Sequence, residues 1–440
     1  FARFLLDWHG LASPQPGSAR LEAVVEQLEG LSLPFAELED RILPLRVPDH
    51  RPEMLDALGA TGRFVWIADG AIDEGEGRVA LYRRERAALF ASTARAVVDG
   101  EGGGDGVAAD PAADSGTCSD PGERALADAI LRRLAVGGAV FFSELLQAFA
   151  QHRPAELEAA LFALAGRGLV TNDTFAPLRA ALAARRRRGA RGARPSRARR
   201  PGRNAPPPAT AGRWSLVAPA GAPPSPTERL HARALALLAR HGIVSRESLE
   251  IESEPGGFAA VYPVLRELEE AGRVRRGHFC AGSTSAQFAL PGAVDRLRAA
   301  RATPAEPQAL LLAALDPAQP YGGALPWPAG GAGRARRAVG ASVVLVDGRA
   351  VVFVERGGRG VVCFEAVADE GGAERAAAER LSMALALLAR SVARLGLRRL
   401  AVETIDGEPA LASPRADFFR RVGFRESARG FEMDRIGSPR

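Results

Sequence analysis

Arginines gathered around one predicted helix and turn are the residues of this chain best suited to chemistry. The stretch "PGGFAAVYPVLRELEEAGRVRRGHF", residues 255–279, reads as a helix that ends at a glycine and continues into a hairpin. The basic side chains on and beside it are Arg246, Arg266, Arg273, Arg275, Arg276 and His278. Arginine stays charged and its planar guanidinium matches phosphate oxygens. These residues therefore predict contact with a nucleic-acid backbone.

A second basic group is the run "RRRRGARGARPSRARRPGR", residues 185–203, which begins with Arg185, Arg186, Arg187 and Arg188. Twelve arginines and no acidic residue lie between Asp173 and Glu228, so subtracting +12 from the net charge of +6 leaves −6 for the rest of the chain. Interleaved Gly, Pro, Ala and Ser predict an irregular linker that can lie along phosphates. The alternative is a solvated linker whose arginines reflect the codon bias of a GC-rich genome.

Aromatic side chains gather in a third place, the loop "LDPAQPYGGALPWP" at residues 315–328, which four prolines stiffen. Tyr321 and Trp327 in this loop precede Arg334, Arg336 and Arg337. Exposed aromatic rings beside arginines can stack on unpaired bases. The alternative is that both rings pack the loop onto its own domain.

Several kinds of chemistry are excluded by residue types that the sequence lacks. All 58 basic residues are arginine, so neither a lysine-containing phosphate loop nor a lysine Schiff base can form. Cys118, Cys280 and Cys363 lie far apart, and no histidine stands near them at metal-site spacing. The sequence has no run of 18 or more apolar residues, so it predicts no membrane-spanning helix. The first residue is Phe1 rather than Met, from which we expect a fragment of a longer chain.

One structural unit is repeated three times along the chain. The pattern L-x-x-L-x-x-x-G begins at Leu55, Leu161 and Leu265, which are separated by 106 and 104 residues. Leucines three apart share one helix face, and the glycine suits a left-handed helix end that leads into a strand. With a helix, a short strand and a second helix upstream, this is the order of a winged helix. We expect the first unit to be a spacer and the third to contact DNA.

The C-terminal third predicts strands and helices in one domain. Residues 340–367 read as three strands joined by tight turns at "DGR" and "RGGRG", and a long helix follows at 372–395. A strand, a short helix and a final strand complete a small barrel or a curved sheet with packed helices. The predicted fold class is α+β and multidomain, with tandem winged helices followed by a β-barrel-like α/β domain. The predicted segments are a winged-helix-like domain (1–98), an acidic Gly-rich linker (99–122), a winged helix (123–183), an Arg/Pro-rich basic linker (184–225), a winged helix (226–300) and the barrel-like domain (301–440).

Several long strings resemble the C-terminal region of the Lhr, or large helicase-related, proteins of bacteria. They are "RFLLDWHGL", "GLVTNDTFAPLRA", "GRWSLV", the stretch 255–279, "QFALPGAVDRLRA" and "LDPAQPYGGALPWP". The resemblance implies a DNA-binding and oligomerising region of an ATP-dependent DNA repair helicase. It also implies a motor domain in cis that uses ATP and Mg, no cofactor in this chain, no membrane, and a place in the bacterial cytoplasm at the nucleoid.

The same arrangement is similar to the winged-helix DNA glycosylases of the AlkZ type, which implies a monofunctional DNA glycosylase as the alternative function. Their Gln-x-Gln signature is absent here, and "AQFALPG" keeps Gln287 alone. Glycosylase chemistry needs a pocket for a flipped base and a carboxylate or amide that positions water. Asp316 and Asp434 are the candidate carboxylates. A third hypothesis, an acetyltransferase-like end at "ADFFRRVGFRES", lacks the matching pyrophosphate loop.

Overall fold

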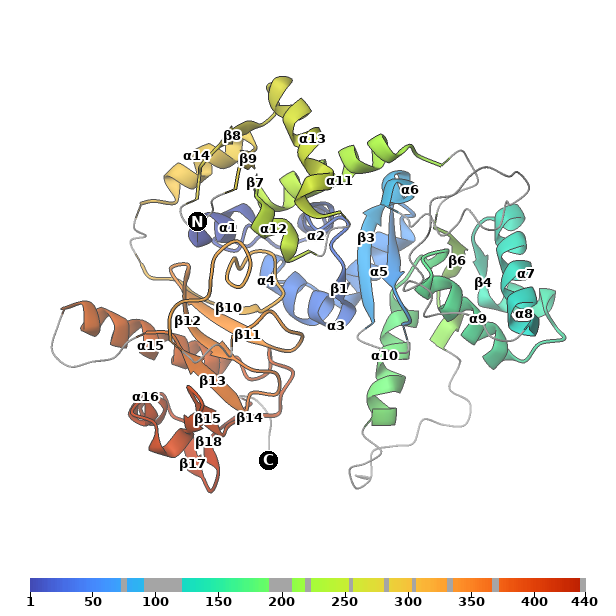
Figure 1. The fold of residues 1–440 in the computed structure, drawn as a ribbon. Helices are drawn as coiled ribbons and strands as arrows, with labels where there is room; N and C mark the ends of the chain where they lie inside the picture. The colour runs from blue at the N-terminus through green and yellow to red at the C-terminus, as the bar shows by residue number, and fades with distance from the viewer. Residues whose placement is uncertain are drawn as a thin grey trace. The chain divides into compact units, whose positions relative to one another are not determined.

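The computed structural model describes residues 1–72, 77–90, 121–189, 208–217, 223–252, 256–280, 285–302, 306–330, 335–365 and 372–435 (Figure 1). The chain divides into two compact units. One comprises Phe1–Arg20, Ala36–His50 and Ala234–Arg440, and the other comprises Leu21–Phe35 and Arg51–Arg233. Most of the predicted acidic linker, residues 99–120, lies outside the described residues.

Three winged helices follow one another along the chain. The first contains α2 (Ser18–Gln27), β1 (Leu33–Pro34), the short helices α3 (Phe35–Glu37), η1 (Leu38–Ile42) and α4 (Leu43–Arg46), then α5 (Pro52–Ala60), β2 (Phe64–Asp69) and β3 (Arg78–Arg83). The second contains α7 (Pro121–Gly137), β4 (Val140–Phe141), α8 (Phe142–Ala148), α9 (Pro154–Gly166), β5 (Val170–Asn172) and β6 (Arg213–Leu216). The third contains α11 (Pro226–His241), β7 (Ile243–Val244), α12 (Arg246–Glu250), α13 (Gly257–Glu270), β8 (Arg275–Gly277) and β9 (Gln287–Ala289).

The repeated leucine and glycine pattern explains why the three units fold alike. Its six leucines are all buried: Leu55, Leu58, Leu161, Leu164, Leu265 and Leu268. Its glycines, Gly62, Gly168 and Gly272, have φ of +73°, +69° and +69°, the left-handed conformation that ends each helix. The sheets have the orders β1-β3-β2, β4-β6-β5 and β7-β9-β8, so the last strand of each wing lies in the middle each time. The predicted winged-helix units are confirmed.

The second wing differs from the predicted one because its return strand lies inside the segment 184–225 that we predicted to be a linker. Strand β6 pairs with β5, with Asn172 opposite Trp214. Helix α10 (Ala176–Gly189) and the turn η6 (Pro208–Thr210) lie between these strands. Arg185 to Arg188 therefore stand on the last turn of a helix and not in an irregular segment, whereas residues 190–207 lie outside the described residues. The basic run is an insertion in a wing.

The C-terminal domain contains an open sheet, so the predicted barrel-like domain is not a closed barrel in the part of the chain that the structure describes. The sheet has six strands in the order β10-β11-β12-β13-β15-β16, and its two outer strands, β10 and β16, do not pair with each other. The outer strand β16 (Glu408–Pro409) has only two residues, too few to close a barrel. The other five are β10 (Ala309–Ala313), β11 (Ser342–Val346), β12 (Arg349–Val354), β13 (Gly360–Cys363) and β15 (Thr404–Ile405).

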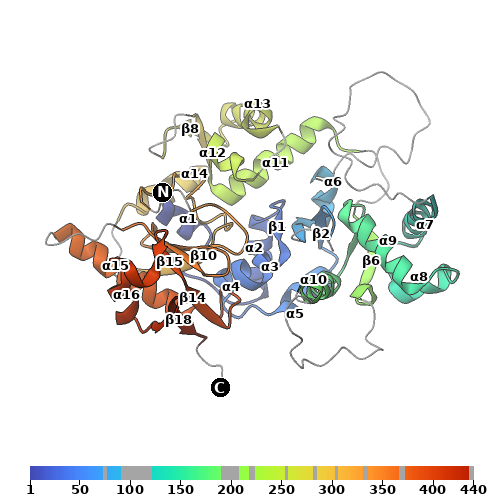
Figure 2. The ribbon, with the colours of Figure 1, turned by 60° about the horizontal axis from the view of Figure 1, so that its bottom comes forward.

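The hairpin between β11 and β12 has the turn that the sequence predicts. Asp347 and Gly348 have φ of +49° and +79°, as a two-residue Asp-Gly turn requires. Helix α15 (Gly372–Arg390) packs on β10, β11 and β12 and covers one face of these strands. Every residue of β11 is buried. Figure 2 shows α15 beside this sheet. A second sheet, β14-β18-β17, consists of β14 (Arg399–Val402), β18 (Gly430–Asp434) and β17 (Arg425–Ser427), with α16 (Ala416–Arg421) in the connection.

Candidate nucleic-acid interface

The wing of the third winged helix carries the basic side chains that the sequence predicts. Arg273, Arg275, Arg276 and His278 are all exposed, and none of them forms an ion pair with a described residue. Strand β8 lies at the edge of the sheet β7-β9-β8, and Arg275 and Arg276 are opposite Ala289 and Phe288 of β9. Because successive side chains of a strand alternate, these two arginines lie on opposite faces of the wing.

Helix α13, which precedes the wing, holds its own domain together through Phe258, Val261, Leu265 and Leu268, all buried. The exposed Arg266 donates to Glu270 at 2.9 Å, so part of its charge is already compensated. Arg246 at the start of α12 is also exposed, and its guanidinium lies 5.9 Å from the centre of the Phe258 ring. All six predicted basic residues thus belong to the third winged helix.

The basic end of α10 starts from a firmly packed helix. Leu178 and Ala181 are buried, and Arg179 forms an ion pair with Asp56 at 2.6 Å. Positive charge at a helix C-terminus is also favoured by the helix dipole. Arg185 to Arg188 therefore follow, at the C-terminal end of α10, directly after the packed part of this helix.

Tyr321 and Trp327 are engaged within the C-terminal domain. Their rings stack at 5.9 Å, and Trp327 also stacks on Phe364 at 5.8 Å. The Tyr321 hydroxyl donates to the Gly348 carbonyl at 2.9 Å, and burial raises the pKa of that hydroxyl. The structure has the alternative arrangement, in which both rings pack the loop onto its own sheet, and both side chains stay half-buried. Stacking on bases therefore stays a prediction.

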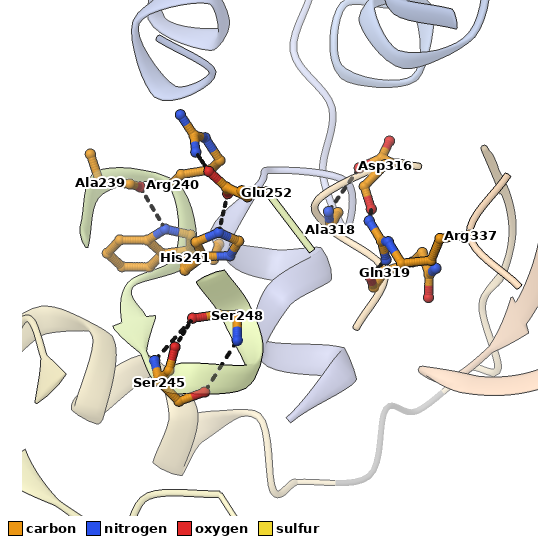
Figure 3. A network of polar contacts seen from close by, with 11 residues as sticks. Ala239, Arg240, His241, Ser245, Ser248, Glu252, Asp316, Ala318, Gln319 and Arg337 are labelled. Atoms are coloured by element: carbon orange, nitrogen blue, oxygen red, sulfur yellow. Dashed lines mark hydrogen bonds and ion pairs between the residues drawn. The ribbon is translucent and has the colours of Figure 1, made fainter. Parts of the chain in front are cut away.

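Asp316 is fully buried in an ion pair with Arg46. Figure 3 shows Asp316 beside Ala318, Gln319 and Arg337. Its two oxygens accept from the Arg46 guanidinium at 2.7 and 2.9 Å, and Oδ1 also accepts from the Ala318 amide at 2.8 Å. Arg337 donates to the carbonyl of Asp316 at 3.1 Å and to that of Gln319 at 2.8 Å. A carboxylate with both oxygens bound inside the protein cannot position water for a substrate, so the catalytic prediction for Asp316 is wrong.

A second buried ionic group lies in the same unit and joins Glu252, which follows α12, to the end of α11. Glu252 forms ion pairs with Arg240 and His241 at the end of α11 (Figure 3). Burial favours the neutral carboxyl, but Arg240 and then His241 outweigh it and lower the pKa of Glu252 to about 2. Sequence reasoning missed this group, although charged residues beside the apolar "GIV" of β7 were a signal.

Asp434 has a different environment, at the exposed end of β18. Arg399 donates to it at 2.7 Å and Arg425 forms a second ion pair with it. The hydrogen bond from Arg399 is the largest cause that lowers the pKa of this carboxyl. Asp434 and Asp316 belong to different parts of the domain, and the structure does not bring them together as a pair.

One cavity of about 150 Å³ is open to solvent in the unit that holds the C-terminal domain. It is lined by Asp40, Arg41, Arg394 and the apolar residues Pro44, Leu45, Pro48, Leu311 and Ala313. Neither predicted carboxylate lines it, whereas Asp40, which the sequence analysis did not select, does. Within the described ranges, no group of three His, Cys, Asp or Glu could hold a metal ion, and no helix is long and apolar enough to cross a membrane.

Three winged helices with an exposed basic wing, followed by a mixed α/β domain, define a protein of the tandem winged-helix class. Residues 1–84 and 223–309 each match a winged-helix domain of the large helicase-related protein. The chain belongs to this large helicase-related (Lhr) family, which confirms the resemblance noted in the sequence.

Two curated relatives and one solved structure are similar to the chain. It is 39% identical over 403 residues to "Lhr helicase/ probable uracil glycosylase" of Mycolicibacterium smegmatis, covering 87% of this chain and 24% of that protein. It is 33% identical over 468 residues to "Lhr helicase/uracil glycosylase" of Escherichia coli, covering 98% of this chain and 28% of that protein. The chain thus spans about a quarter of each relative. The Streptomyces sahachiroi DNA glycosylase AlkZ aligns over 92% of this chain and 98% of its own, with a TM-score of 0.44 and 17% identity.

Proposed function

We propose that the chain is the C-terminal DNA-binding and oligomerisation region of an Lhr-type ATP-dependent DNA repair helicase. The observation that carries DNA binding is the exposed wing with Arg273, Arg275 and Arg276, which no described acidic side chain neutralises. An N-terminal motor in cis would use the ATP and Mg, as expected of a helicase that acts on bacterial DNA in the cytoplasm.

Self-association is supported by two exposed apolar side chains of the second winged helix, Val136 and Phe141, which are 91% and 50% exposed. Sedimentation velocity measures the number of chains that associate.

The purified chain is expected to bind single-stranded and forked DNA at low salt and to lose affinity steeply as salt is added. Each neutralised phosphate contributes about −0.7 to −0.9 to the slope of log K against log salt, so three wing arginines predict a slope of about −2 or steeper. Fluorescence anisotropy between 50 and 300 mM salt, roughly the range over which such effects are large, measures it. Absence of binding at the lowest salt, or a flat salt dependence, contradicts the proposal.

Base excision is a second candidate function, because both curated relatives carry "uracil glycosylase" in their names. The cavity beside Asp40 supports it, since a flipped base needs a pocket with a carboxylate at its wall. Incubation with uracil-containing DNA, followed by alkali, is expected to cleave the strand at the uracil. Replacing Asp40 with Asn is expected to lower the rate about 100-fold or more if this carboxylate assists proton transfer.

The comparison variant is Asp434→Asn, which changes a half-buried, ion-paired carboxylate of the same unit that the sequence analysis selected. Uncleaved DNA would exclude base excision by this chain. Cleavage that survives Asp40→Asn but is lost in Asp434→Asn would restore Asp434 as the catalytic carboxylate that the sequence analysis suggested.

A further inference from the structure

The exposed side of α13 has the wrong charge for a helix that enters a DNA groove. Its last two turns carry one arginine and three glutamates, and Arg266 is already paired with Glu270. Glu267 is exposed and Glu269 is half-buried, and neither forms an ion pair with a described residue. Phosphates on both sides of a major groove would repel these carboxylates, and this repulsion is little screened at separations below a Debye length of about 8 Å.

The wing beyond Gly272 has the opposite charge. Between Arg273 and His278 there are three arginines and no acidic residue, and all four basic side chains are exposed. Strand β8 is an edge strand, so no further strand among the described residues covers it. Arg275 and Arg276, on opposite faces of this strand, can reach phosphates on the two sides of one groove.

We propose that the third winged helix binds duplex DNA through its wing, which contacts the phosphate backbone, while α13 stays outside the major groove. This inference rests on the proposed DNA binding and specifies its mode. Contacts to phosphates position a protein but carry no base information. Binding by this winged helix is therefore independent of sequence, as suits a protein that must act wherever a damaged duplex occurs.

The test uses the whole chain and two duplexes of equal length and unrelated sequence. Replacing Arg275 and Arg276 with alanine is expected to weaken binding to both duplexes by about tenfold and to make the salt slope shallower by about 2. The control R298A/R301A removes two exposed arginines on and after α14 (Pro291–Ala299), and we expect it to change affinity less than threefold. Circular dichroism checks that each variant is folded. If R275A/R276A does not fold, the variant R275Q/R276Q is used in its place.

A second variant, E267Q/E269Q, tests the helix directly. If α13 stays outside the groove, removing its carboxylates changes affinity no more than the α14 control does, and equally for both duplexes. A larger gain in affinity, or a preference for one duplex that this variant alters, would show that α13 enters the groove and would overturn the inference. So would an unchanged affinity of R275A/R276A. If the unaltered chain binds no DNA, this result would instead contradict the proposed function itself.

Discussion

Replacing Arg46 with alanine is expected to lower the free energy of unfolding of the unit that holds the C-terminal domain by about 3–5 kcal/mol. Arg46 is 0% exposed and donates to both oxygens of Asp316, at 2.7 and 2.9 Å. It also donates to the Ile42 carbonyl at 3.2 Å and contacts His9 Nδ1 at 3.3 Å. Alanine would leave the Asp316 carboxylate buried without its cation, and an unpaired buried charge is among the most costly defects in a protein.

Urea unfolding followed by circular dichroism measures this effect, and two controls interpret it. Arg420 forms exposed ion pairs with Asp417 and Glu426, so Arg420→Ala is expected to cost less than about 1 kcal/mol. The double variant R46M/D316L removes both charges and should recover much of the loss. A loss below about 1 kcal/mol for Arg46→Ala would mean that water reaches Asp316, which would reopen a catalytic role for it.

The buried His9 adds a dependence on pH to the same ionic group. Burial, and then the positive charge of Arg46, lower the pKa of His9 well below its ordinary value, so the ring is neutral in the folded protein. The unfolded chain binds this proton more readily, so His9 contributes stability that is complete above about pH 6.5 and declines as the pH falls below it. Urea unfolding of Arg46→Ala and of the unaltered chain is therefore compared at one pH above 7.

Local patterns predicted the parts of the fold that depend on neighbouring residues. The leucines and glycine of "LRELEEAGR" determine a helix face and a left-handed end within eight residues, and the Asp347–Gly348 turn is determined by two residues. The exposure of Arg275 and Arg276 followed from the same local reasoning. Charge and glycine position within one short segment are enough to place such side chains on a wing.

The features that the sequence analysis did not predict depend on contacts between distant segments of the chain. The sequence around Asp316 suggested a reactive carboxylate because its partner, Arg46, lies 270 residues earlier in the chain. Trp327 similarly stacks on Phe364, which follows directly after β13, three strands later in the chain. Strand β6 was missed because some 40 residues separate Asn172 from Trp214, and strand pairing over such a distance leaves no periodic signal in the sequence. Strong basic composition then made the whole intervening segment resemble a linker.

Replacing Trp214 with alanine distinguishes a linker from a wing insertion. Trp214 is 0% exposed, and its ring packs edge-on against Phe162 and Trp66, with centroids 6.1 and 6.2 Å away. Its indole nitrogen donates to the Ala209 carbonyl at 3.0 Å. Removing a fully buried tryptophan from such a core is expected to cost about 3–5 kcal/mol. If residues 184–225 formed a solvated linker, the same change would cost almost nothing.

The matched control for Trp214→Ala is Arg213→Ala at the neighbouring position of β6. Arg213 is exposed and pairs with Asp173 at 2.7 Å, so its loss is expected to cost less than about 1 kcal/mol. Thermal unfolding of both variants measures the difference. Because β6 is the middle strand of the sheet β4-β6-β5, losing Trp214 should also release both ends of the basic insertion from the second winged helix. We therefore expect a protease that cleaves after arginine to act faster on Trp214→Ala than on Arg213→Ala. Equal stability of the two variants would show that the segment is a linker.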